Sequence, residues 1–238
     1  MTSKLKQHIV GLLGDGPISP YLIRLHRLRR VISRVDERLR NDYVEKASTP
    51  KLQIGGGWRL LDGWLNTDIA IIPGVMCMDA TQRFPFPDDI FHRIYSEHMI
   101  EHVSYQEGVY MLKECYRILR AGGVIRVVTP NLATILGLYV HDLCAAQNEY
   151  VEWICQTFVR DSPPNPVSVI NTMFHEWGHQ FIYDEKTLAN LMHGVGFHSV
   201  RRCRLGESSF PDLQNMENEQ RYPEGLLNFE SIALEAVK

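Results

Sequence analysis

The stretch KLQIGGG, residues 51–57, decides the fold. Its first four residues favour a short β-strand, and three glycines follow at once. Glycine lets the backbone approach a small molecule closely and adopt a positive φ angle. A strand that runs directly into such a turn indicates a ligand-binding loop, although a structural turn explains three glycines about as often.

Downstream of this stretch, strands alternate with helices. We expect strands at 64–69, 74–79, 92–97 and 124–130. A helix precedes the last of these: Ser104 and Glu107 form a capping box, and Gly122–Gly123 are expected to end it. Asp184 caps a further helix, and strands near 197–205 and 231–237 follow. Alternation of this kind predicts an α/β fold with a mainly parallel sheet.

Two segments stand outside the alternation. Residues 1–50 are predicted to form an N-terminal helical arm, with an amphipathic helix over 19–40. It packs on its own domain, makes a dimer contact or lies on a membrane surface. Residues 51–238 form the main domain, in which 131–183 is a helical insertion that covers the substrate. Four residues of this insertion could line the wall of the substrate site: Tyr139, Trp153, His175 and Trp177.

Composition limits the function. The 238 residues carry a net charge of −3, with +6 over 1–51 and −9 over the remainder. Without a basic stripe on the body, we expect no nucleic-acid partner. No apolar run approaches the roughly 20 residues of a membrane span. The 5 scattered cysteines indicate reduced thiols, and so a cytoplasmic protein.

Several candidate binding residues follow predicted strands. Gly55, Gly56 and Gly57 follow the first, Asp68 ends the second, Asp79 the third, and Glu97 the fourth. Ligands of parallel sheets bind beyond the carboxyl ends of the strands, so these residues should meet at one edge. A carboxylate there can accept hydrogen bonds from both ribose hydroxyls.

The first connection is compressed. Ten residues separate Gly57 from Asp68, too few for an ordinary crossover helix. We expect a turn or a single helical turn. The loop also lacks the full G-x-G-x-x-G of dinucleotide folds.

Five phrases together resemble a family: LQIGGG, GWLNTDI, MDATQRFPFPDDIFHRIYSEHMIEHV, ECYRILRAGGVIRVVTPN and YDEKTLANLMHGVGF. They look like class I S-adenosylmethionine-dependent methyltransferases, most of all the small type 11-like branch. The resemblance covers about residues 52–131 and 175–205. It implies a Rossmann-like, seven-stranded, mainly parallel sheet whose last strand is antiparallel.

The resemblance also implies site residues for S-adenosylmethionine. The three glycines would face its methionine part, and Asp68 its ribose. Asp79 and Ala80 would border its adenine, whereas Glu97 and His98 would lie near its reactive methyl group. One departure is Gln53, because the family often has an acidic residue at that position.

Two zinc-protease motifs also occur. Residues 98–102 read H-x-x-E-H, and 175–179 read H-E-x-x-H. Both motifs need two histidines on one helix face and a third ligand. His98 falls at a strand end and Gly178 interrupts the second motif, so we expect no metal and keep a metalloprotease as the least favoured alternative.

The predicted function is methylation, most simply of an oxygen on a small molecule, sugar or glycan precursor. His98, then His102, then His179 are the candidate bases, and Glu101 could orient one of them. Local hydrogen bonding alone would also explain these histidines. The alternative from another class is a non-catalytic, methyltransferase-shaped binding module.

Overall fold

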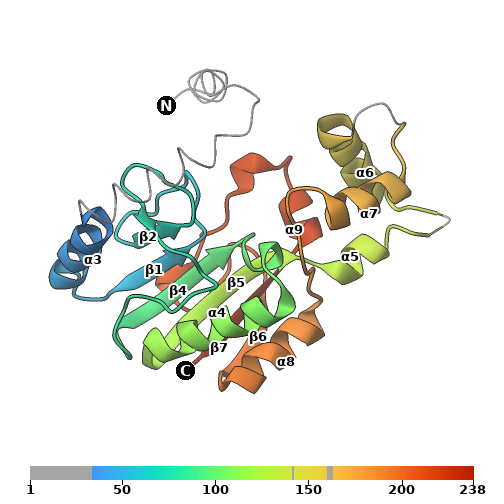
Figure 1. Cartoon of the computed structure of the whole chain (residues 1–238). Helices are drawn as coiled ribbons and strands as arrows, with labels where there is room; N and C mark the ends of the chain where they lie inside the picture. The colour runs from blue at the N-terminus through green and yellow to red at the C-terminus, as the bar shows by residue number, and fades with distance from the viewer. Residues whose placement is uncertain (1–33, 141, 160–162) are drawn as a thin grey trace.

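The computed structural model describes residues 34–140, 142–159 and 163–238. Its centre is a 7-stranded sheet of order β3-β2-β1-β4-β5-β7-β6 (Figure 1). The strands are β1 Lys51–Ile54, β2 Leu65–Asp68, β3 Met76–Cys77, β4 Phe91–Glu97, β5 Leu119–Pro130, β6 His198–Cys203 and β7 Ser231–Val237.

Strand directions confirm the predicted fold. β1 pairs in parallel with β2 and β4, β2 with β3, and β4 with β5. The last strand, β7, lies between β5 and β6 and is antiparallel to both. The sheet is therefore Rossmann-like and mainly parallel, with an antiparallel final strand.

Helices α4 Tyr105–Ile118 and α8 Glu185–Val195 cover one face of the sheet (Figure 1). The predicted capping box of α4 is present, and the Asp184 side chain accepts a hydrogen bond from the Thr187 amide to cap α8. The predicted end of α4 is wrong. The helix ends at Ile118, because the next residue, Leu119, already pairs with Phe91 of β4.

Alternation along β5 separates two apolar layers. Ile125 and Val127 join the core under α4 and α8. Val124 and Val128 face the other side, which is covered by the segment 204–230. This segment includes α9 Leu226–Glu230 and two 3₁₀ turns, Pro211–Leu213 and Glu219–Arg221.

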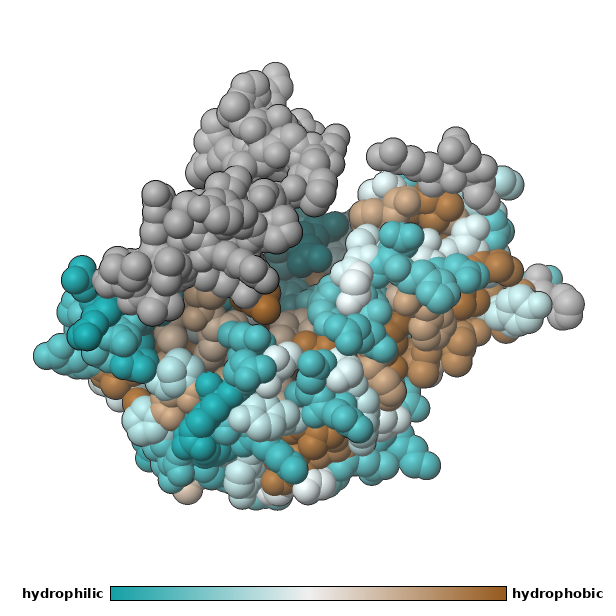
Figure 2. Space-filling view, viewed as in Figure 1, coloured by the Kyte–Doolittle hydropathy of each residue, from teal (hydrophilic) through white to brown (hydrophobic). Residues whose placement is uncertain are grey.

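A lobe beyond β5 contains α5 Leu132–Leu136, α6 Ala145–Phe158 and α7 Pro166–His175. It has its own apolar cluster around Tyr150, Ile154 and Met173. Figure 2 shows brown patches over the lobe. Its exposed large hydrophobic side chains are Leu136, Tyr139, Val140, Phe158, Val167, Phe174 and Trp177.

The N-terminal arm is described only in part, since 19–33 of the predicted helix lie outside the described residues. The described helix, α3 Val35–Lys46, extends past the predicted end at residue 40. Tyr43 donates a hydrogen bond to the Gly63 carbonyl, and Arg40 to that of Pro85. This part packs on its own domain. Among the described residues, no helix is both long and apolar enough to span a bilayer.

Candidate functional site

The glycine turn after β1 is sterically constrained. Gly55 has φ 70° and Gly57 has φ 54°, both in the left-handed region that favours glycine. A Cβ on Gly55 would lie 2.5 Å from Met99 Cγ, and one on Gly56 would lie 2.6 Å from Gln53 Cδ. The turn runs to β2 without a helix, as its length predicted.

Asp68 holds this turn against β2. Its Oδ2 accepts a hydrogen bond from the Gly57 amide at 2.8 Å, and its Oδ1 accepts one from the Ala70 amide at 2.7 Å. One strand further, Asp79 Oδ1 accepts bonds from the amide and the hydroxyl of Thr81 at 2.9 and 2.7 Å. Both carboxylates therefore stabilise loops at the carboxyl edge of the sheet.

A cavity of about 300 Å³ lies at this edge. Four of the predicted cofactor residues and two of the predicted bases line it: Gly55, Asp68, Asp79, Ala80, His98 and His102. Ile69, Met78 and Met99 add apolar walls. The edge thus brings together residues from the ends of β1, β2, β3 and β4.

Glu97 does not line this cavity. Its Oε2 lies 2.9 Å from Arg59 Nη1, and its Oε1 accepts a hydrogen bond from the Asn218 amide at 2.9 Å. Glu97 therefore links the end of β4 to the turn after β1 and to the C-terminal segment. Gly56 and Gly57 shape the turn without lining the cavity.

His98 follows β4 with φ 48°, a left-handed conformation that is uncommon outside glycine. Its Nδ1 lies 3.2 Å from Glu101 Oε1, and its Nε2 lies 3.1 Å from the Ser231 hydroxyl. Backbone strain of this kind gathers at functional sites. The imidazole of His98 lies between Glu101 and Ser231.

Glu101 is fully buried, at 0% exposure. Its Oε2 accepts a hydrogen bond from the Thr129 hydroxyl at 2.9 Å, whereas its Oε1 has no hydrogen-bond partner of good geometry. Burial opposes ionisation of Glu101, but the neighbouring His98 lowers its pKa. Burial likewise opposes the imidazolium of His98, but Glu101 raises its pKa.

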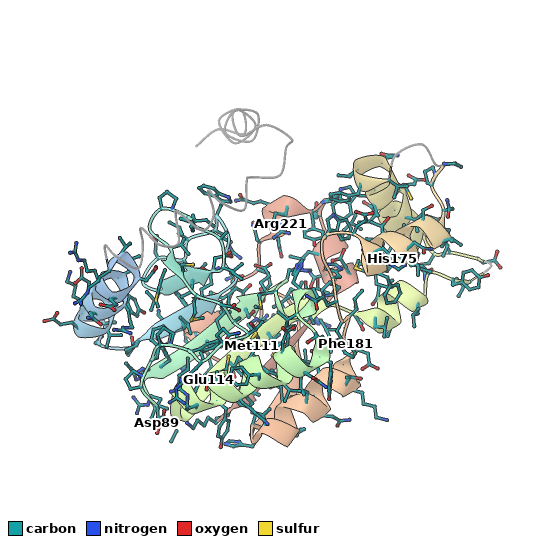
Figure 3. The ribbon with its side chains drawn as sticks, in the orientation of Figure 1. Asp89, Met111, Glu114, His175, Phe181 and Arg221 are labelled. Carbon is teal, nitrogen blue, oxygen red and sulfur yellow. The ribbon has the colours of Figure 1, made fainter. Side chains whose placement is uncertain are left out.

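A second cavity, of about 410 Å³, adjoins the first and shares His98 and His102 with it. Its walls come from the lobe and from the C-terminal segment: Trp153, Ile154, Phe158, Trp177, His179, Arg221, Tyr222 and Glu230. Figure 3 marks Arg221 on the C-terminal segment and His175 at the end of α7. Of the four residues expected in the substrate wall, Trp153 and Trp177 line the cavity, whereas Tyr139 and His175 do not.

Neither zinc-protease motif lies on one helix. His98 follows β4, while His102 ends a 3₁₀ turn, Ile100–His102. His175 ends α7, and Gly178, with φ 78°, separates it from His179. The structure therefore lacks the helical face that both protease motifs require.

The loop after α7 nevertheless brings His179 beside His102, with ring centroids 4.9 Å apart. Burial lowers the pKa of His102, against the opposing effect of Glu101. Gln180 donates a hydrogen bond to the His102 carbonyl at 2.8 Å, which fastens the loop to the turn.

Sequence reasoning missed the wall supplied by the C-terminal segment. Arg221, Tyr222 and Glu230 carry no spacing signal, because long-range packing alone brings them to the lobe. Arg126 anchors that segment. Its role was detectable in the sequence, because it is a charged residue inside an otherwise apolar strand. Its guanidinium contacts Glu217 Oε1 at 2.6 Å and Glu235 Oε1 at 2.8 Å.

Comparisons with known proteins agree with this fold. Residues 64–127 match the family model described as a methyltransferase domain. A curated relative is 34% identical over 96 residues, 38% of this chain: 2-methyl-6-phytyl-1,4-hydroquinone methyltransferase 2, chloroplastic, from Oryza sativa subsp. japonica. This chain spans 27% of the length of that relative.

Solved structures of similar shape include two described as S-adenosylmethionine-dependent methyltransferases. The one from Archaeoglobus fulgidus is 16% identical, with a TM-score of 0.48 over 92% of this chain and 100% of that one. The one from Mesorhizobium loti is 14% identical, with a TM-score of 0.48 over 85% and 96%. Similarity at this level does not bear on substrate.

The matched segment, residues 64–127, lies within a seven-stranded sheet whose last strand, β7, is antiparallel to its neighbours. This part of the chain is therefore similar to methyltransferases, the class that its sequence phrases resemble.

Proposed function

We propose that this protein transfers a methyl group from S-adenosylmethionine to an oxygen of a small, hydroxylated ring compound. The carrying observation is the pair of adjoining cavities that meet at His98 and His102. One has the glycine turn and carboxylates that suit a nucleoside, and the other has aromatic walls. In this proposal the cofactor occupies the first and the acceptor the second.

Hydrogen-bond acceptors and bare backbone that line the first cavity support cofactor binding there. A carboxylate has about four lone-pair sites, so Asp68 can accept both ribose hydroxyls while keeping its bonds to the loop amides. Asp79 and Ala80 border the adenine. The bare backbone at Gly55 admits the methionine part closely. The neutral Gln53 at the end of β1 is buried and gives this end no charge.

The acceptor class follows from the second cavity. Trp153, Trp177 and Tyr222 supply flat apolar faces, while Arg221 and the buried Glu230 add polar groups to the lining. Sugars and phenols both combine a flat apolar face with hydroxyls, and both belong to the proposed class. The rice relative is named for a hydroquinone, which is a ring compound that carries hydroxyl groups, and this supports a ring compound as the acceptor.

In the proposed reaction the acceptor oxygen attacks the sulfonium methyl in line. A new C–O bond forms, the C–S bond breaks with its electron pair left on sulfur, and the hydroxyl proton passes to the imidazole of His98. The cofactor supplies the electrophile, so the protein mainly positions the two molecules and excludes water.

Calorimetry with S-adenosylmethionine tests the first half of this proposal, and transfer of a labelled methyl group to a panel of phenols and sugars tests the second. Saturable binding with transfer to ring hydroxyls is expected. Binding without transfer to any acceptor would favour the non-catalytic binding module. Absence of cofactor binding would reject the proposal itself.

A further inference from the structure

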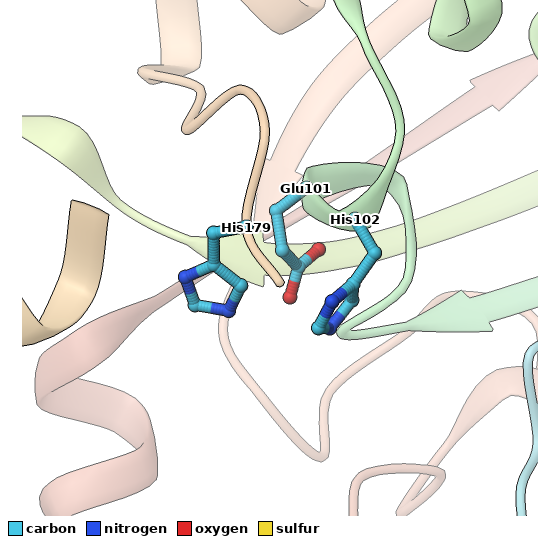
Figure 4. Close-up of side chains that lie close together, drawn as sticks. All are labelled: Glu101, His102 and His179. Carbon is cyan, nitrogen blue, oxygen red and sulfur yellow. The ribbon is translucent and has the colours of Figure 1, made fainter. Parts of the chain in front are cut away.

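The two zinc-protease motifs, neither of which lies on one helix, contribute side chains to a single cluster. Glu101 and His102 come from the first motif, and His179 comes from the second, 77 positions later in the sequence. One ligand atom from each of these residues lies within 4.8 Å of the others. Figure 4 shows the Glu101 carboxylate between the two imidazole rings, with His179 entering from the loop after α7.

We propose that Glu101, His102 and His179 bind one divalent transition-metal ion of the zinc class at the wall of the aromatic cavity. Two histidines and a carboxylate form a recognised zinc donor set that leaves further positions open. Zinc–nitrogen and zinc–oxygen bonds are about 2.0–2.2 Å long. Side-chain rotations that move each ligand atom by about 1 Å would therefore bring all three atoms within bonding distance of one ion.

The outer contacts of the cluster are those that metal ligands need. His179 Nδ1 lies 2.7 Å from the Met173 carbonyl, so this nitrogen carries the proton and Nε2 is left to bind. The Thr129 hydroxyl fixes Glu101 Oε2 in the same way.

Glu101 Oε1 supplies an independent indication of a ligand. It is a carboxylate oxygen on a fully buried side chain without a well-formed hydrogen bond. It lies 3.2 Å from His98 Nδ1. Because a carboxylate oxygen has two lone pairs, Oε1 can bind an ion and keep this contact.

The open positions of the ion face the cavity, since all three ligands line it. The ligand that fits them is an oxygen donor, such as a hydroxyl or carboxylate. If the proposed function holds, that donor is the acceptor hydroxyl, and the ion lowers its pKa as a Lewis acid before methyl transfer. Zinc binding itself does not depend on the proposed function.

The test is titration of the chelator-stripped full chain with zinc chloride, followed by calorimetry and metal analysis. We expect one equivalent to bind. His179→Ala should weaken this binding by at least about 100-fold, because losing even an outer partner of a ligand costs about 10–100-fold. His175→Ala is the matched control, since His175 is exposed, belongs to the same motif and lies outside the cluster; it should bind zinc as the unmodified chain does.

Thr129→Val provides a second variant that keeps all three ligands and the shape of the core. It should weaken zinc binding by roughly 10-fold. Cobalt(II) in place of zinc should give visible absorption bands that His179→Ala abolishes. The proposal is overturned if zinc fails to bind. It is also overturned if zinc binds equally to His179→Ala, because zinc would then be bound at another site, such as the cysteines.

Calorimetry with S-adenosylmethionine separates the two proposals. His179 does not line the cofactor cavity, so His179→Ala should bind the cofactor normally while losing zinc. Zinc binding without cofactor binding would reject the proposed function and leave the metal site standing. The reverse result would reject the metal site alone.

Discussion

At the scale of single residues, His98 is where the two cavities meet. His98 is the residue that follows β4, and its backbone is left-handed. It contacts Glu101 and lines the cavity of about 300 Å³. In the proposed reaction, the Glu101 carboxylate would stabilise the imidazolium that forms when His98 accepts the proton.

His98→Ala should therefore lower turnover by about 10²–10⁴-fold, the usual contribution of general acid–base catalysis. The dissociation constant for S-adenosylmethionine should change little. Turnover and calorimetry on the same preparation check both statements. His198→Ala, on the exposed edge strand β6, is the control and should retain full turnover. Unchanged turnover in His98→Ala would reject its role as base.

Asp68→Ala should instead act on the cofactor. Hydrogen bonds to a charged group contribute about 1.5–3 kcal/mol each, so the dissociation constant should rise at least about 10-fold. Asp62→Ala, in the exposed part of the same connection, is the matched control. An unaltered dissociation constant in Asp68→Ala would exclude the ribose contact.

That Gly55, Asp68 and Asp79 line one cavity was predictable, because each follows or ends a strand and parallel strands place their carboxyl ends at one edge. The position of Glu97 at the end of its strand predicted the edge of the sheet at which it lies. It did not predict its partners, Arg59 and Asn218. The meeting of His102 with His179 was not predictable, since it depends on how the loop after α7 folds back over the sheet.

At the scale of elements, β5 joins the sheet to the segment that covers its second face. Arg126 is fully buried on β5, and its guanidinium also donates to the backbone carbonyls of Arg204 and Glu207. A central strand thus holds in place the segment that later supplies Arg221 and Tyr222. The cavity of about 410 Å³, which Arg221 and Tyr222 line, therefore depends on a contact that lies away from it.

Arg126→Leu should lower the free energy of unfolding by about 3–5 kcal/mol, because Glu217 is left buried without its cation and Glu235 keeps only Arg201, whose side chain is partly exposed. Denaturant unfolding measures the change. Arg202→Leu, which breaks an ion pair exposed on both sides, is the control and should cost at most about 1 kcal/mol. Similar costs for the two variants would show that the buried cluster contributes nothing special.

The same cluster predicts sensitivity to acid. Burial opposes ionisation of Glu235, but Ser208, Arg201 and Arg126 lower its pKa below the usual value. A lowered carboxyl pKa stabilises the fold above its unfolded pKa of about 4.3, and this stabilisation is lost as the pH falls towards the folded value. The melting temperature should fall over that range. Glu235→Gln should flatten this dependence, and an unchanged slope would exclude the effect.

Most elements were predictable from local pattern, including the capping box of α4 and the Asp184 cap of α8. The end of α4 was misplaced because glycine usually terminates helices, whereas here pairing with Phe91 begins three residues earlier. α9 and the 3₁₀ turns of 204–230 lack a periodic apolar pattern, so only tertiary packing defines them.

At the scale of the whole molecule, cofactor binding should stabilise the fold by mass action. At a concentration 100 times the dissociation constant, S-adenosylmethionine should add about 2.7 kcal/mol. For a chain of this size, that amounts to a rise in melting temperature of roughly 5–10 °C. Thermal scans with and without cofactor measure it. Asp68→Ala should show a smaller rise at the same concentration, and equal rises would contradict the assigned cavity.

The position of β7 has a consequence for synthesis. This strand is the last of the sheet in the chain, yet it pairs with β5 on one side and β6 on the other. A nascent chain emerging from the ribosome has to hold β5 and β6 apart, or unpaired, until residues 231–237 arrive. Assembly of the sheet therefore waits until the final strand has been translated. Until then the growing polypeptide exposes unpaired strand edges that can pair with other chains.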